Sequence, residues 1–72
     1  GNLMTYLNRV EANNRSAQIE VVSELFEVHF YDAGSYMGTI EYPDKSIYYV
    51  QDAANNWINH IMDVETVKRY KR

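Results

Sequence analysis

The chain has 72 residues, with 7 basic and 10 acidic side chains for a net charge of −3, seven tyrosines and no cysteine. The absence of cysteine excludes disulfides and cysteine-ligated zinc, and the length allows one domain with a small core, which we place at residues 2–72 because Gly1 resembles a tag remnant. No apolar run approaches the twenty or so residues needed to cross a bilayer, so we expect no membrane association and a cytoplasmic protein.

The first segment, residues 4–12, favours a strand and is followed by a plausible tight turn at Asn13-Asn14. One side of a short helix is the alternative that its spacing leaves open. The strand would place on one face Met4, Tyr6, Val10 and Ala12, whereas the helix would align Leu3, Tyr6, Leu7 and Val10.

Residues 17–22 alternate in the same way, with Ile19 and Val21 in phase. The apolar positions then change from odd to even numbers by Phe26. A change of phase within a β region indicates a bulge or sharp bend, which we place at residues 22–24.

The hairpin at residues 25–42 is the clearest element. Residues 25–31 alternate between apolar and polar side chains, residues 32–35 supply turn chemistry, and Gly34 suits a positive φ angle. In the second strand, residues 36–42, we expect a shared face for Tyr36, Gly38, Ile40 and Tyr42.

A helix is predicted at residues 46–62, with Ser46 as its cap and a start as late as Val50 as the alternative. Its apolar side would be formed by Ile47, Val50, Ala54, Trp57, Ile58 and Ile61. Residues 64–70 favour a short last strand, with an extension of the helix left open. The expected fold is therefore a small β-rich α+β domain of four or five bent antiparallel strands with one amphipathic helix.

Candidate catalytic and metal-binding groups are few. The two histidines, His29 and His60, could in principle combine with Glu27, Asp52 or Asp63, and Glu27 and His29 would share a strand face. No histidine pair at helical spacing and no glycine-flanked serine occurs in the sequence. We therefore expect no catalytic residues, no metal ligands, no cofactor and no enzymatic activity.

The basic side chains gather at the C-terminus, while residues 20–65 contain a single one, Lys45. This tail, residues 68–72, could contact phosphates by charge and a base by stacking, although the acidic body would oppose a polyanion. The candidate nucleic-acid-binding residues are Lys68, Arg69, Tyr70, Lys71 and Arg72.

The tyrosines exceed what one small core can bury, which favours a protein interface and self-association. The alternative is that their rings cover the core and their hydroxyls remain in water. The candidate interface residues are Tyr31, Tyr36, Tyr42, Tyr48 and Tyr49.

Three segments carry a resemblance: Phe30-Tyr31-Asp32 to Gly38, then Tyr42-Pro43-Asp44-Lys45-Ser46, then residues 49–57 with the sequence YVQDAANNW. Together they resemble small uncharacterised proteins of tailed phages of marine cyanobacteria, over about the second half of the chain. The resemblance implies a location in the host cytoplasm and brings no established activity.

The number and bending of the strands are also similar to Sm-like small barrels, so an Sm-like open barrel is one form the sheet could take. The RNA-binding loops of that family carry an Arg-Gly or Lys-Gly step, which this sequence lacks. We expect a non-catalytic protein-interaction or assembly module that forms homo-oligomers, with a nucleic-acid-binding accessory protein as the alternative.

Overall fold

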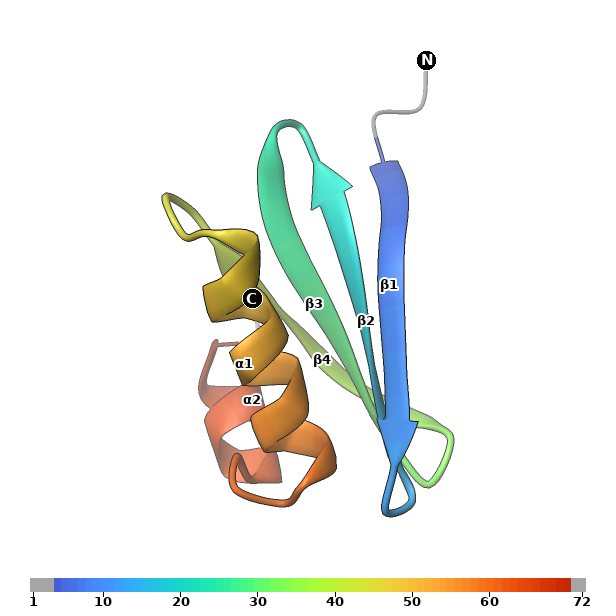
Figure 1. Cartoon of the computed structure of the whole chain (residues 1–72). Helices are drawn as coiled ribbons and strands as arrows, with labels where there is room; N and C mark the ends of the chain where they lie inside the picture. The colour runs from blue at the N-terminus through green and yellow to red at the C-terminus, as the bar shows by residue number, and fades with distance from the viewer. Residues whose placement is uncertain (1–3, 71–72) are drawn as a thin grey trace.

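The computed structural model describes residues 4–70, with side chains from residue 8 onwards, and shows one antiparallel sheet with two helices against one of its faces (Figure 1). The strands lie side by side in chain order: β1 (Met4–Ala12), β2 (Arg15–Val22), β3 (Leu25–Asp32) and β4 (Ser35–Tyr42). The helices α1 (Ile47–Ile58) and α2 (Val64–Tyr70) follow. This is the expected small β-rich α+β fold, with a strand rather than a helix at the start and with two helices instead of one.

The strands are joined by three two-residue turns, Asn13-Asn14, Ser23-Glu24 and Ala33-Gly34. Both residues of every turn have a positive φ, between 51° and 83°, as type I′ hairpin turns require. The bulge predicted at residues 22–24 is therefore wrong, because the chain reverses there. Since Val22 pairs with Leu25, odd residues of β2 lie opposite even residues of β3, and this pairing accounts for the change of phase.

Bulges occur elsewhere in the sheet. Phe30 pairs with Gly38 and Tyr31 pairs with Tyr36, so that Met37 is an extra residue in β4. Tyr36 consequently shares a face with Tyr31, and its predicted place beside Ile40 is wrong. A second register shift lies between residues 6 and 8 of β1. The predicted face of Met4 and Tyr6 lies outside the described side chains.

The core lies between the sheet and the helices. Trp57 is fully buried and its ring meets that of Phe30 edge-on, with 5.2 Å between the ring centroids. The indole nitrogen of Trp57 donates a hydrogen bond to the backbone oxygen of Tyr31 at 3.0 Å, which satisfies its polar group. The buried residues that form the core cluster are Ala17, Ile19, Val28, Phe30, Ile40, Val50, Ala54, Trp57, Ile58 and Val67.

Helix α1 begins where the sequence predicts, because the Ser46 hydroxyl accepts the backbone N–H of Tyr49 at 3.3 Å. It ends at Ile58, earlier than predicted. The chain turns back through His60, which has φ 61°, and the backbone N–H groups of His60 and Ile61 bond to carbonyls in the last turn of the helix. Ile61 is therefore 72% exposed instead of buried.

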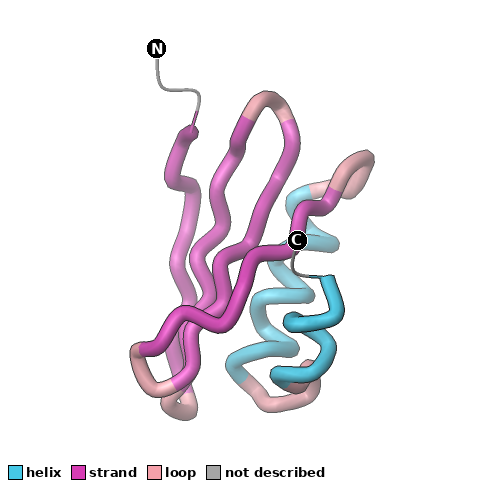
Figure 2. Tube along the Cα trace, turned by 180° about the vertical axis from the view of Figure 1, so that it is seen from behind, coloured by secondary structure: helices cyan, strands magenta, loops and turns pink. Residues whose placement is uncertain are grey.

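Residues 64–70 form the second helix and not the predicted strand. The Asp63 carboxylate caps it by accepting the backbone N–H and the hydroxyl of Thr66, both at 2.9 Å. These hydrogen bonds lower the pKa of Asp63 below its usual value, with a smaller contribution from Arg69. The helix buries Val67 and packs beside β4, as the view from behind shows (Figure 2). Neither α1 nor α2 has the length and apolar character to span a membrane.

Candidate functional site

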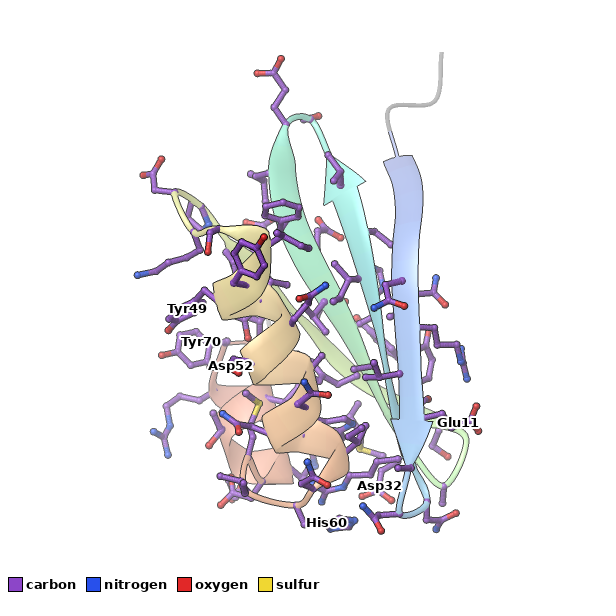
Figure 3. All side chains as sticks on the ribbon, in the orientation of Figure 1. Glu11, Asp32, Tyr49, Asp52, His60 and Tyr70 are labelled. Carbon is purple, nitrogen blue, oxygen red and sulfur yellow. The ribbon has the colours of Figure 1, made fainter. Side chains whose placement is uncertain are left out.

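The two histidines lie in separate places. His60 lies at the end of the molecule where the β1–β2 turn meets the chain after α1 (Figure 3), and its Nε2 donates to the backbone oxygen of Asn13 at 2.8 Å. This contact is structural. Asp52 lies in the first half of α1, away from His60. Among residues 8–70, no three side chains of metal-ligating type are close enough to hold a metal ion.

His29 lies on the sheet face that the helices leave uncovered, which we call the open face. As predicted, it shares this face with Glu27, and 3.0 Å separate its Nε2 from the Glu27 Oε1. The same Nε2 lies 3.7 Å from Oε1 of Glu20 on the neighbouring strand. His29 is therefore placed between two carboxylates.

Three glutamates form a row across the open face. Glu20 of β2 is directly opposite Glu27 of β3, and Glu27 is directly opposite Glu41 of β4. Like charges directly opposite each other in an antiparallel sheet are unfavourable. We call these three residues the glutamate row.

Glu20 is the unusual member of the row because it is only 3% exposed. Its Oε2 accepts a hydrogen bond from the Gln18 amide at 2.5 Å, while its Oε1 is buried with no hydrogen-bond partner. A buried polar atom without a partner costs about 1–3 kcal/mol, and more when it is charged, so such atoms are uncommon in folded proteins. The row thus contains one buried carboxylate oxygen without a hydrogen-bond donor.

Beside the glutamate row, the open face carries aromatic rings. The centroids of Tyr31 and Tyr36 are 5.7 Å apart, and those of His29 and Tyr36 are 6.4 Å apart. The Arg9 guanidinium lies 5.8 Å from the centroid of the Tyr31 ring, and the hydroxyls of Tyr36 and Thr39 are 2.6 Å apart. Together these side chains make a mixed aromatic and charged surface.

A second site lies on the helical side of the molecule, in a groove of about 500 Å³ between the end of β4 and the two helices. Tyr42 of β4, Tyr49 of α1 and Tyr70 of α2 line it, and we call it the tyrosine groove. The rings of Tyr42 and Tyr49 meet edge-on at 5.9 Å, and Tyr49, Tyr70 and Asp52 lie together in Figure 3. Lys45 also lines the groove, with its Nζ 4.7 Å from the Tyr49 centroid.

The three phenols are electrostatically linked. Burial raises the pKa of Tyr42, with smaller contributions from the neighbouring Tyr49 and Tyr70 phenols, and together they bring it to about 12. Tyr42 therefore keeps its proton at physiological pH and can both donate and accept a hydrogen bond.

The predicted interface residues do not form one patch. Tyr31 and Tyr36 lie on the open face, Tyr42 and Tyr49 line the tyrosine groove, and Tyr48 is 77% exposed on α1 without lining the groove.

The predicted basic tail is helical over its first three positions. Lys68 and Arg69 are exposed in the last turn of α2, whereas Tyr70 lines the tyrosine groove. Lys71 and Arg72 lie outside the described residues.

Sequence reasoning did not identify Glu20, Glu41 or Arg9 as site residues. Their polar character is ordinary, and only the pairing registers bring the glutamates into one row. The two-residue turns that set those registers are the signal that could have revealed it.

Comparison of the chain with protein-family models, with curated proteins and with solved structures gave no significant match.

Proposed function

We propose that this domain is a non-catalytic assembly module that self-associates through the open face of its sheet. The observation that carries the proposal is the glutamate row, in which three carboxylates lie directly opposite one another on the uncovered face of the sheet. A cationic donor from a second protein surface could reach the exposed Glu41 and the partly exposed Glu27, and it would relieve the repulsion between the opposed carboxylates.

The composition of the open face supports the same function. Tyrosine and arginine are the residue types that contribute most to binding at protein interfaces, and Tyr31, Tyr36 and Arg9 lie together there. A 72-residue chain also buries a comparatively small fraction of its surface, so that covering the second face of the sheet would add stability.

A second copy of the chain would bring an arginine, Arg9, to the glutamate row. In a twofold dimer the same surface meets itself, so a group on one copy contacts a different group on the other. Arg9 lies on the edge strand β1 and the glutamate row crosses β2, β3 and β4. Each copy would supply one cationic group and one row of carboxylates, and two contacts between Arg9 and the glutamate row would form.

Sedimentation velocity over a wide concentration range tests the proposal. We expect a concentration-dependent dimer whose dissociation constant rises roughly tenfold or more in the Tyr36→Ser variant, as for an interface tyrosine at a hot spot. Tyr48→Ser is the matched control, because Tyr48 is exposed on α1 and should leave the dimer unchanged. A monomer at all concentrations, or equal weakening by both variants, would contradict the proposal.

Nucleic-acid binding is the second candidate, and the exposure of Lys68 and Arg69 in the last turn of α2 favours it. The same sedimentation experiment with a short single-stranded RNA separates the two. A species that shifts only with RNA, and loses the shift as salt is added, would assign the function to the basic end of the chain.

A further inference from the structure

We infer that the tyrosine groove is a binding site for a small organic cation of the alkylammonium or guanidinium class. This site is separate from the open face, and its existence does not depend on self-association. Its volume of about 500 Å³ lies within the range of about 300–1,000 Å³ that small-molecule sites occupy.

The walls of the groove have the right chemistry for a cation. Tyr42, Tyr49 and Tyr70 come from three separate elements, and an aromatic face attracts a cation within about 6 Å of its centroid. The protein itself supplies an example, because the ammonium group of Lys45 lies 4.7 Å from the Tyr49 centroid. An organic cation in the groove would take over this ring from a flexible, exposed side chain.

The groove contains a carboxylate that can pair with a cation. Asp52 lines the groove and makes no ion pair within the described residues 8–70. Glu41 also borders the groove, but its side chain belongs to the glutamate row on the open face. Lys45 is the one basic residue lining it among those described, so the side chains of the groove carry one negative and one positive charge. The hydroxyl oxygens of the three tyrosines can accept a hydrogen bond from an N–H donor.

Titration with choline, followed by NMR of the tyrosine ring resonances, tests the inference. We expect the rings of Tyr42, Tyr49 and Tyr70 to shift with a dissociation constant of about 1 mM or tighter, a modest affinity suited to an open aromatic site. The neutral isostere 3,3-dimethyl-1-butanol should cause no comparable shift. Equal binding of the two probes, or no shift with choline, would overturn the inference.

Variants sharpen the test. Tyr49→Leu should weaken choline binding about tenfold and Asp52→Asn about threefold to fivefold, since one removes a ring and the other a partly solvated charge. Tyr48→Leu is the matched control, because the adjacent Tyr48 does not line the groove. Equal loss in Tyr48→Leu and Tyr49→Leu would contradict a site in the groove.

Lys45→Met gives the most specific readout. It removes both the like charge and the ammonium group that lies on the Tyr49 ring, so choline should bind about threefold more tightly. A purely structural role of Lys45 predicts no gain, and unchanged or weaker binding would count against the inference.

The source of the cation is distinguished by a second probe, N-acetyl-lysine methylamide. Tighter binding of this probe than of choline would assign the groove to a basic protein side chain, and tighter binding of choline to a free organic cation. Sedimentation of the same samples shows whether the open face self-associates. The groove can bind choline in either case, so the two proposals can fail independently.

Discussion

Arg15 connects more parts of the molecule than any other single side chain we describe. Its Nε lies 3.0 Å from Oδ2 of Asp32, and its Nη1 donates to the backbone oxygens of Trp57 at 3.2 Å and Met62 at 2.9 Å. The guanidinium also lies 4.0 Å from the centroid of the Trp57 ring. A buried cation thus closes the C-terminal end of α1, where the helix dipole favours positive charge.

We predict that Arg15→Met lowers the free energy of unfolding by about 2–3 kcal/mol. The substitution removes the donor of Asp32 and of the Met62 carbonyl, whereas the Trp57 carbonyl keeps the His60 N–H, and the partial exposure of Asp32 reduces the penalty from that of a fully buried pair. Arg15→Lys should restore less than half of the loss, because an ammonium cannot reproduce the planar fork and the stacking on Trp57. Urea denaturation measures both.

Lys68→Met serves as the control for charge alone, since Lys68 is exposed on α2 and should change stability by less than about 0.5 kcal/mol. A loss for Arg15→Met no larger than the loss for Lys68→Met would show that the Arg15 contacts contribute little.

At the scale of elements, the two-residue turns determine the pairing register of the strands. Glu24 and Gly34 occupy the same second position in two equivalent turns, with φ of 68° and 83°. Only glycine adopts this conformation without steric cost, and a Cβ added at Gly34 would meet nothing within 4 Å, so strain and not crowding decides the outcome there.

We therefore predict opposite effects of substitution at these two turn positions. Glu24→Gly should raise the free energy of unfolding by about 0.5–1 kcal/mol, and Gly34→Ala should lower it by about 1 kcal/mol. Thermal unfolding monitored by circular dichroism gives both values in one series. Shifts of the same sign would mean that contacts in the turns outweigh backbone strain.

The elements also mark how far the sequence could predict the fold. Alternation predicted β2, β3 and β4, and the Ser46 cap predicted the start of α1, because these signals are local. The turn at Ser23-Glu24 was missed because neither residue is usual in a type I′ turn. The change in apolar phase between β2 and β3 was therefore attributed to a bulge.

Helix α2 was missed for a different reason. Val64, Thr66 and Val67 favour a strand by β-branching, and this outweighed a helix signal that the sequence does contain. Asp63 at the cap, Glu65 in the first turn and Lys68 with Arg69 in the last turn are typical of a helix. The tyrosine groove depends on how the helices pack and could not be predicted from local pattern, whereas the glutamate row could be predicted only if every two-residue turn was identified first.

At the scale of the whole molecule, the helices cover one side of the sheet and leave the other side as the open face (Figure 1). The two candidate sites follow from this arrangement. The glutamate row lies on the uncovered side, and the tyrosine groove lies where the sheet ends and both helices meet it. The burial of Tyr42 indicates that the tyrosine groove is formed, because it requires β4, α1 and α2 to be packed together.

This dependence makes the alkaline stability of the protein a test of the whole arrangement. The pKa of Tyr42 is raised from 10.0 to about 12 in the fold, so the fold favours the protonated phenol. The stabilisation is fully present below pH 10 and is lost as the pH rises through 10 towards 12. The thermal midpoint should therefore decrease as the pH is raised from 9 to 11, and it should decrease less in Tyr42→Phe, which has no proton to lose.

Tyr48→Phe is the control and should behave like the unmodified protein. An equal fall in Tyr42→Phe would mean that the phenol of Tyr42 is not the group responsible, and that the groove is more open to water than its packing indicates.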